Sequence, residues 1–149
     1  MNNSSAVVTW QQAEDALIGA VEYLAALPDR DQAFLSAGSR SAWPEIVRDL
    51  QSDYADREAE PRRQLGLKEM AHLERMLLGE QAAVLVVPPG HRALVGKVLR
   101  MKRWVPPGGF LWSDVWVWAG GRACGVTSDA LRMRYERAIG RVAAAMEVV

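Results

Sequence analysis

Few residues in this chain could do acid–base, nucleophilic or metal chemistry, and they do not gather along the sequence. The chain contains two His and one Cys. His72 lies in a Met- and Leu-rich stretch without a second His at metal-ligand spacing, so we interpret it as a structural residue. His91 follows Pro-Pro-Gly, where it helps to position a loop. Cys124 has no His at a suggestive spacing, which favours a small core residue.

The glycine-rich pieces do not add a nucleotide site. Pro-Pro-Gly-Gly and Ala-Gly-Gly lack the Gly-Lys-Ser/Thr ending of a phosphate loop and the strand context of a dinucleotide site. A single Cys also excludes an internal disulfide and a Cys-rich zinc site. We therefore expect a protein that is not an enzyme and that needs no cofactor or metal.

Composition places the chain among globular proteins. Its 149 residues, of which 50% are hydrophobic and 24% charged, fit one domain with a packed core and exclude a disordered chain. The longest apolar stretch, residues 82–89, is too short to span a membrane, and residues 1–6 lack the features of a secretion signal. The expected location is the cytoplasm, without a membrane partner.

The net charge of zero conceals two oppositely charged halves. Residues 1–60 hold 11 acids and 4 bases, whereas residues 61–149 hold 7 acids and 14 bases. We expect an acidic N-terminal helical region, used for packing or oligomerisation, and a basic helical region. Such asymmetry points to a nucleic-acid-binding half, although an uneven scatter of charges on an ordinary helical protein would give the same numbers.

Helical periodicity dominates the chain. Thr9 to Gln12 forms a capping box before an amphipathic helix that stops at Leu27-Pro28, and a second helix is expected from Ser41 to about Tyr54. Residues 33–40 read as a loop and residues 55–63 as the best linker candidate. A third helix begins near Leu67 and could continue to Val87.

The C-terminal third predicts two further helices after a fourth one at residues 91–103. Residues 110–118 suit either a strand or a short helix, and helix is favoured because no other convincing strand exists to pair with it. Gly120-Gly121 ends that helix, and a last helix opens at Thr127 or Ser128 and runs to about Val148. The prediction is an all-α fold, a small helical domain with a C-terminal helix-turn-helix at about residues 110–148.

The last helix carries a row of arginines. Its apolar face would pack on the preceding helices and contains Leu131, Tyr135, Ala138, Ile139, Val142 and Met146. Arg134, Arg137 and Arg141 recur at steps of three and four, so they line one flank and could follow a phosphate backbone. A solvated arginine face on an ordinary amphipathic helix is the alternative interpretation.

Other residues complete the predicted DNA interface. Thr127, Ser128 and Arg132 lie near the start of the last helix, from which side chains can reach base edges. Additional bases that could contact phosphates are Arg122 in the turn and Lys97, Arg100, Lys102 and Arg103 in the fourth helix.

Two segments of the C-terminal third resemble an uncharacterised family encoded mainly in phages and prophages. The likeness lies in Trp112-Ser-Asp-Val115 and in residues 125–139, with Ser41 to Arg48 and Leu73 to Met76 similar to its upstream parts. The resemblance implies a C-terminal helix-turn-helix similar to the DNA-reading region of sigma factors. This chain departs from the family pattern by about five extra residues around residues 119–124, which lengthen the turn.

Two functions follow from these patterns. The first is a phage- or prophage-type DNA-binding protein that acts in transcription regulation or in recognition of DNA for packaging. The alternative is a protein-interaction module whose basic half docks on an acidic partner, such as a polymerase or a capsid component. The stripe of Trp10, Leu17, Val21 and Leu24 also suggests a homodimer or higher oligomer through the first two helices, unless that stripe is core.

Overall fold

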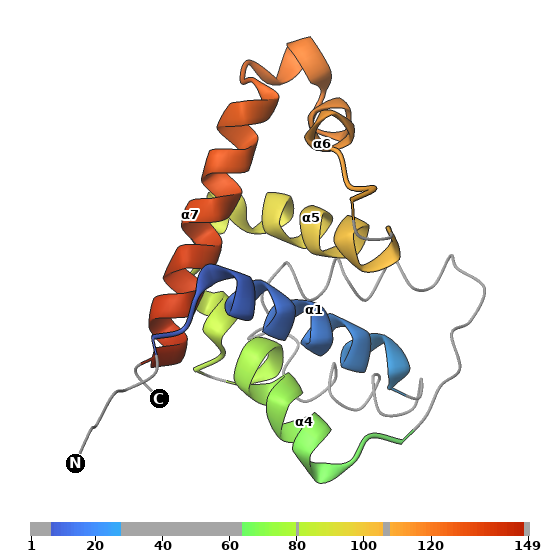
Figure 1. Ribbon diagram of the computed structural model, residues 1–149, viewed down its shortest axis with the longest axis vertical. Helices are drawn as coiled ribbons and strands as arrows, with labels where there is room; N and C mark the ends of the chain where they lie inside the picture. The colour runs from blue at the N-terminus through green and yellow to red at the C-terminus, as the bar shows by residue number, and fades with distance from the viewer. Residues whose placement is uncertain (1–6, 28–63, 80, 106–107, 148–149) are drawn as a thin grey trace.

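The computed structural model describes residues 7–27, 64–79, 81–105 and 108–147, and every regular element in them is helical (Figure 1). The α-helices are α1 (Trp10–Ala26), α4 (Leu67–Leu73), α5 (Arg92–Trp104), α6 (Trp112–Trp118) and α7 (Ser128–Glu147). Between them lie the π-helical turn η2 (Glu74–Leu78) and the 3-10 turns η3 (Ala83–Val86), η4 (Pro89–His91) and η5 (Gly121–Cys124). The predicted all-α fold class is confirmed. The predicted loop, second helix and linker between residues 33 and 63 lie outside the described residues.

Helix α1 begins as its sequence predicts. The Thr9 hydroxyl accepts a hydrogen bond from the Gln12 backbone N–H at 3.2 Å, and the Gln12 side chain accepts one from the Thr9 N–H at 3.0 Å. This reciprocal pair satisfies two donors that the first helical turn leaves open. The helix ends at Ala26, directly before the Leu27-Pro28 pair.

The third helix begins at Leu67, as predicted, but its continuation to Val87 is wrong. Helix α4 ends at Leu73, widens into the π-helical turn η2, and stops at Gly79, whose backbone is extended. The Gly79 N–H donates to the Glu74 carbonyl at 2.7 Å, and a Cβ on Gly79 would lie 2.8 Å from that carbonyl oxygen. Only glycine, which has no Cβ, can approach the Glu74 carbonyl this closely, and the helix ends there.

The predictions for the C-terminal helices are confirmed within one or two residues. Residues 112–118 form helix α6 and not a strand, and Gly120, with a positive φ of 116°, follows its end. Helix α7 begins at Ser128, and the hydroxyl of Thr127 accepts a hydrogen bond from the Ala130 N–H at 3.1 Å. Thr127 is therefore the N-cap of α7.

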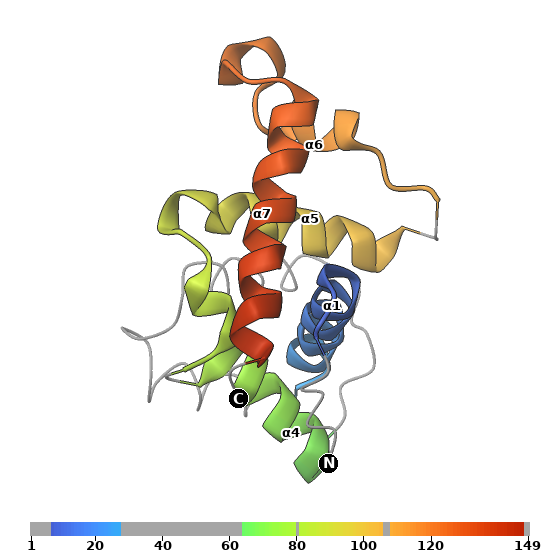
Figure 2. The ribbon, with the colours of Figure 1, turned by 60° about the vertical axis from the view of Figure 1, so that its left-hand side comes forward.

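Helix α7 is the axis around which the other helices are arranged (Figures 1 and 2). Helix α1 contacts α7, α5 and α4, while α5 and η3 also contact α7. In both views the N-terminal half of α7 extends beyond α1 and α5, and α6 lies beside this projecting half. The chain therefore presents α6, η5 and the start of α7 at one end of the molecule.

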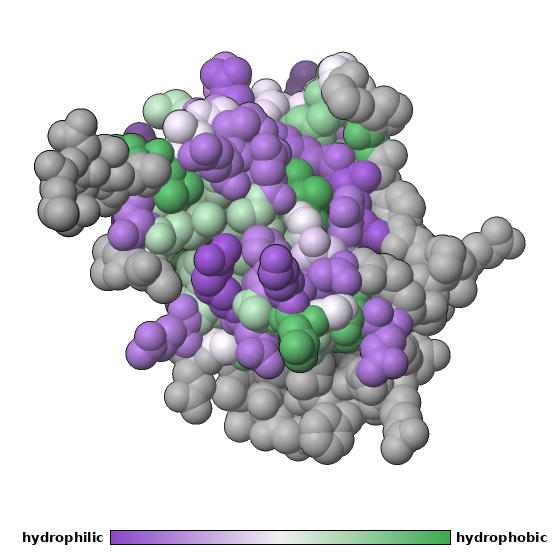
Figure 3. All heavy atoms as spheres, turned by 60° about the horizontal axis from the view of Figure 1, so that its bottom comes forward, coloured by the Kyte–Doolittle hydropathy of each residue, from purple (hydrophilic) through white to green (hydrophobic). Residues whose placement is uncertain are grey.

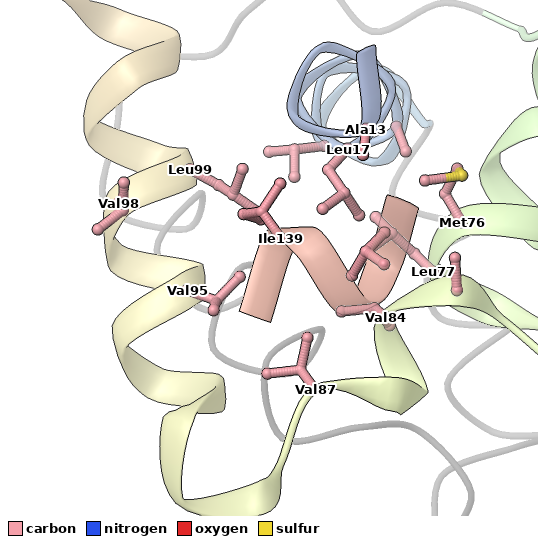
Figure 4. Packing of buried hydrophobic residues seen from close by; sticks show 14 of the residues in the cluster. Ala13, Leu17, Met76, Leu77, Val84, Val87, Val95, Val98, Leu99 and Ile139 are labelled. Atoms are coloured by element: carbon pink, nitrogen blue, oxygen red, sulfur yellow. The ribbon is translucent and has the colours of Figure 1, made fainter. Parts of the chain in front are cut away.

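The core lies where α1, α5, η2, η3 and α7 meet. Figure 4 shows Leu17 of α1, Leu99 of α5, Ile139 of α7 and Leu77 of η2 pointing toward one another, and all four are fully buried. The predicted apolar face of α7 is confirmed, since Leu131, Tyr135, Ala138, Ile139 and Val142 are buried and Met146 is half-buried. Close packing of these side chains holds α7 against the other helices from Leu131 to Val142.

On the face of the molecule shown in Figure 3, hydrophilic residues are interspersed with small groups of hydrophobic ones. Among the described residues, no single helix has the length and apolar composition to cross a membrane. One bent pair, Leu67–Val86 with Pro89–Arg103, reaches that length and composition only when its two halves are counted together. Leu77 and Val95 of this pair are fully buried in the core of the chain.

Candidate nucleic-acid interface

Helix α6 packs against the projecting half of α7. Val115 of α6 is fully buried, and the indole N–H of Trp116 donates to the Val126 carbonyl at 2.8 Å. The Trp112 ring lies 5.5 Å from the ring of Tyr135 on α7, centroid to centroid. These contacts give the two helices a fixed relative orientation, which a helix-turn-helix needs in order to present its second helix.

The connection between the two helices is long. Helix α6 ends at Trp118 and α7 begins at Ser128, whereas a helix-turn-helix turn has about three or four residues. The intervening residues contain η5 and three glycines with positive φ, Gly120, Gly121 and Gly125. The lengthened turn predicted around residues 119–124 is therefore present as a compact 3-10 turn, and Arg122 within it is exposed.

The arginine row is exposed over the length of α7 that it spans. Arg134, Arg137 and Arg141 are all exposed, and none of them forms an ion pair with another described residue. Because they are spaced by three and four residues, their side chains leave the helix on one flank. The structure thus brings these three predicted residues together.

The residues predicted near the start of α7 are not on that flank. Arg132 is two residues from Arg134, and residues at this spacing leave a helix on nearly opposite sides. Its guanidinium lies 3.8 Å from the Asp129 carboxylate, and 49% of its side chain is exposed. Ser128 is half-buried, and Thr127 is exposed but its hydroxyl accepts the capping hydrogen bond from the Ala130 N–H. Arg132 is therefore the member of this group best placed to meet a ligand.

Helix α5 contributes less to the interface than its sequence suggests. Lys97, Arg100 and Arg103 are half-buried, and the Lys97 ammonium lies 5.8 Å from the ring centroid of Trp118. That distance allows a cation–π contact between α5 and α6. Lys102 has another partner altogether, the Glu14 carboxylate at 2.8 Å.

Glu14 is the centre of a buried polar cluster that sequence reasoning missed. It is 4% exposed and accepts hydrogen bonds from the Lys102 ammonium at 2.8 Å and from the Tyr135 hydroxyl at 2.5 Å. The Lys102 ammonium also lies 5.1 Å from the Phe110 ring centroid and 5.3 Å from that of Tyr135. The Lys102 side chain is half-buried and its ammonium is paired with Glu14, so we do not assign it to the interface.

Burial of Tyr135, together with the negative charge of Glu14 and its hydrogen bond, raises the pKa of this phenol far above its ordinary value. The phenol stays protonated and donates to Glu14. A signal for the cluster was present in the sequence, because Glu14 is four residues after Trp10 and three before Leu17, within the apolar stripe of α1.

Two further side chains that could do chemistry, His72 and Cys124, have partners within the chain. Nε2 of His72 lies 2.9 Å from the Ala16 carbonyl oxygen, and its ring meets Tyr23 edge-on. The Cys124 thiol donates to the Val126 carbonyl at 3.3 Å. Within the part of the chain that the structure describes, no group of three or more His, Cys, Asp or Glu side chains could hold a metal ion.

Comparison of the chain with protein-family models, with curated proteins and with solved structures finds no match. A function must therefore be argued from the geometry of the helices and from the charges that they carry.

Proposed function

We propose that this chain is a DNA-binding protein of the helix-turn-helix type that places the projecting half of α7 in the major groove. Its biological setting, proposed from the phage and prophage resemblance, is transcription regulation or recognition of DNA for packaging, in the cytoplasm. No catalytic step is part of this proposal.

The observation that carries the proposal is an exposed row of arginines that begins on the projecting half of α7, with Arg134 and Arg137, and continues with Arg141 on the half that packs in the core. Arg134, Arg137 and Arg141 are exposed on α7, and Arg122 is exposed in the turn before it. The 20 residues of α7 extend about 30 Å, and the major groove admits one α-helix. Arginines on one flank of such a helix face one phosphate backbone when the helix enters the groove.

A matched pair of double variants tests this proposal. Arg134→Ala/Arg137→Ala removes two bases from the row, and Lys68→Ala/Arg75→Ala removes two exposed bases from the α4–η2 segment. Both variants change the net charge equally. We expect the first to weaken binding to a labelled random-sequence duplex at least about tenfold at moderate salt. Each phosphate that is no longer contacted keeps its condensed counterion, so the counterion release that favours binding is lost.

The control variant is expected to bind within a factor of about two of the wild type, as its bases lie outside the interface. Fluorescence anisotropy gives both affinities, and far-ultraviolet circular dichroism verifies that each variant keeps its helices. Equal weakening by the two double variants would show that only overall charge matters.

An acidic protein partner is the second candidate function, and exposed apolar side chains on α6 and at its N-cap favour it. Leu111 and Val117 are exposed, and 44% of Trp118 is accessible beside Lys97. Aromatic and apolar residues next to a base are typical of protein interfaces. A chain that binds no duplex DNA at any salt concentration, but retains an acidic polypeptide on a column, would favour this function over the first.

A further inference from the structure

A cavity opens where α1 faces the end of α5 and the segment that leads into α6 (Figure 1). Its volume is about 460 Å³, which is within the range of small-molecule sites. Helix α1 contributes Glu14, Ile18 and Glu22 to its lining, and these residues recur at steps of four along one helix face. Within the part of the chain that the structure describes, the arginine row of α7 does not line this cavity, so the cavity needs an explanation of its own.

Glu14 offers an acceptor to this cavity. Its side chain is buried, and both of its hydrogen bonds, from the Lys102 ammonium and the Tyr135 hydroxyl, end on one oxygen, Oε2. No described residue donates a hydrogen bond to the other oxygen, Oε1, and this atom is not sealed from solvent. Polar atoms of buried side chains have hydrogen-bond partners in the large majority of cases. Because Glu14 lines the cavity, we expect the partner of Oε1 to enter there.

Apolar side chains form much of the remaining wall. Ile18 of α1, Val105 at the C-cap of α5 and Phe110 before α6 all line the cavity, and each is half-buried. The Phe110 ring is held by an edge-on contact with the Trp112 ring, with 5.2 Å between the ring centroids. A molecule that covers these side chains removes apolar surface from water, which favours binding.

The charges that line the cavity balance one another. Two carboxylates, Glu14 and Glu22, are accompanied by two cations, Lys102 and Arg103. The Lys102 ammonium lies 2.8 Å from the Glu14 carboxylate, so a cationic molecule that approached Glu14 would be repelled by Lys102. An anionic molecule would be repelled by Glu14 itself. A neutral molecule meets neither repulsion, so the site favours a neutral hydrogen-bond donor.

We propose that this cavity binds a compact, neutral and largely apolar molecule that donates an N–H or O–H hydrogen bond to Oε1 of Glu14. Heteroaromatic compounds with a ring N–H and phenols belong to this class. Water also supplies a donor, but only a molecule with an apolar body removes Ile18, Val105 and Phe110 from water. The site is independent of the proposed DNA-binding function, and its test uses no DNA.

Two isomers, skatole and N-methylindole, test the proposal on the full-length wild type. Skatole keeps the ring N–H, whereas N-methylindole carries the same methyl group on the nitrogen and cannot donate. We expect skatole to bind with a Kd of about 1 mM or lower. N-methylindole should bind about tenfold more weakly, the effect of losing one hydrogen bond to a charged acceptor. Titrations followed by amide NMR spectra give both affinities, and the amide signals of Ile18, Val105 and Gly108 should shift.

Variants that fill the cavity locate the bound molecule. Ile18→Trp is expected to weaken skatole binding at least about tenfold, because its larger side chain occupies the space that the ligand needs. Leu67→Trp, a similar enlargement of an exposed residue on α4, is the matched control and keeps the wild-type affinity. Circular dichroism verifies the fold of both variants. Val105→Trp fills the cavity from α5 and replaces Ile18→Trp if that variant loses its helices.

Three results would overturn the proposal. They are absence of skatole binding up to its solubility limit, equal affinities of the wild type for the two isomers, and unchanged skatole binding in a folded cavity-filling variant. Skatole binding that exceeds that of N-methylindole, and that is lost in Ile18→Trp but kept in Leu67→Trp, supports it. None of these results bears on DNA binding, because the measurements contain no duplex.

Discussion

Glu14 joins three helices through one buried carboxylate, since Lys102 comes from α5 and Tyr135 from α7. A buried charge is tolerated when it is paired and hydrogen-bonded, as it is here with an ammonium and a phenol. Tyr135 lies four residues after Leu131 and next to Arg134, so the cluster holds α7 near the point where its exposed arginines begin. The cluster thus connects core packing with the orientation of the proposed interface.

Replacing Glu14 should therefore destabilise the chain strongly. We expect Glu14→Ala to lower the free energy of unfolding by about 3 kcal/mol, because the buried Tyr135 hydroxyl and the half-buried Lys102 ammonium lose their acceptor. Urea denaturation followed by circular dichroism measures this change. Glu22→Ala, an exposed glutamate on the same helix, should change stability by less than about 0.5 kcal/mol. Similar effects of the two substitutions would contradict the role assigned to the cluster.

The raised pKa of Tyr135 predicts a loss of stability at alkaline pH. The unfolded chain releases the phenol proton near pH 10, whereas the folded chain retains it, so the unfolded state binds fewer protons above that pH. The stabilisation is complete below about pH 10 and decreases above it, by up to about 1.4 kcal/mol per pH unit.

Comparison with Tyr135→Phe isolates this contribution. The variant lacks the phenol hydroxyl, so its free energy of unfolding should decline less steeply between pH 9 and pH 11. The two slopes should differ by up to about 1.4 kcal/mol per pH unit, the value for one proton. Urea denaturation at several pH values in this interval gives both slopes. Parallel curves for the two proteins would argue against a protonated, buried Tyr135.

Sequence patterns located most of the candidate interface residues but not their partners. The spacing of Arg134, Arg137 and Arg141 predicted a shared flank, and the structure brings them onto it. Lys102 was predicted to face DNA because its charge alone is visible in the sequence. Its carboxylate partner lies 88 positions away, and only the tertiary fold brings the two together.

At the scale of secondary-structure elements, the sequence predicted the helix starts that depend on hydrogen bonds within one turn. The capping box at Thr9 and the N-cap at Thr127 fix helix starts through hydrogen bonds within one turn, and both starts were predicted. The end of this helical segment at Leu78 was missed because no proline marks it. It depends on the return of Gly79 onto the Glu74 carbonyl, a contact that apolar periodicity does not encode.

Two glycines in the C-terminal third should respond oppositely to alanine. Gly125 has a positive φ of 78° three residues before α7 begins, so we expect Gly125→Ala to cost about 1–2 kcal/mol through backbone strain. Gly140 lies inside α7 in open space, and Gly140→Ala should stabilise the chain by about 0.5–1 kcal/mol. Thermal unfolding of both variants measures the difference. A stabilising effect of Gly125→Ala would show that the turn before α7 has another conformation.

At the scale of the whole molecule, the core uses residues that were also considered for dimerisation. Leu17, Val21 and Leu24 are fully buried within the single chain, and of that stripe only Trp10 is exposed. The stripe is therefore core, and it no longer supports pairing through α1. The oligomeric state stays a prediction, and light scattering at micromolar concentration tests it, with a monomer contradicting the dimer.

The distribution of charge also acts at this scale. The chain is neutral overall, so any attraction to DNA must come from local concentration of bases and not from net charge. The projecting half of α7 and its turn carry an excess of bases, since Arg122, Arg132, Arg134 and Arg137 are exposed there together with the acids Asp129 and Glu136. A neutral chain that binds duplex DNA would therefore do so through one defined surface.

The salt dependence of duplex binding tests this account most directly. The slope of the logarithm of the association constant against the logarithm of the salt concentration reports how many phosphates the chain neutralises. We expect a clearly negative slope for the wild type, reduced by about one unit in each of the single variants Arg134→Ala, Arg137→Ala and Arg141→Ala. An unchanged slope and affinity in a folded Arg134→Ala/Arg137→Ala/Arg141→Ala variant would contradict it, because the arginine row would then be a solvated face.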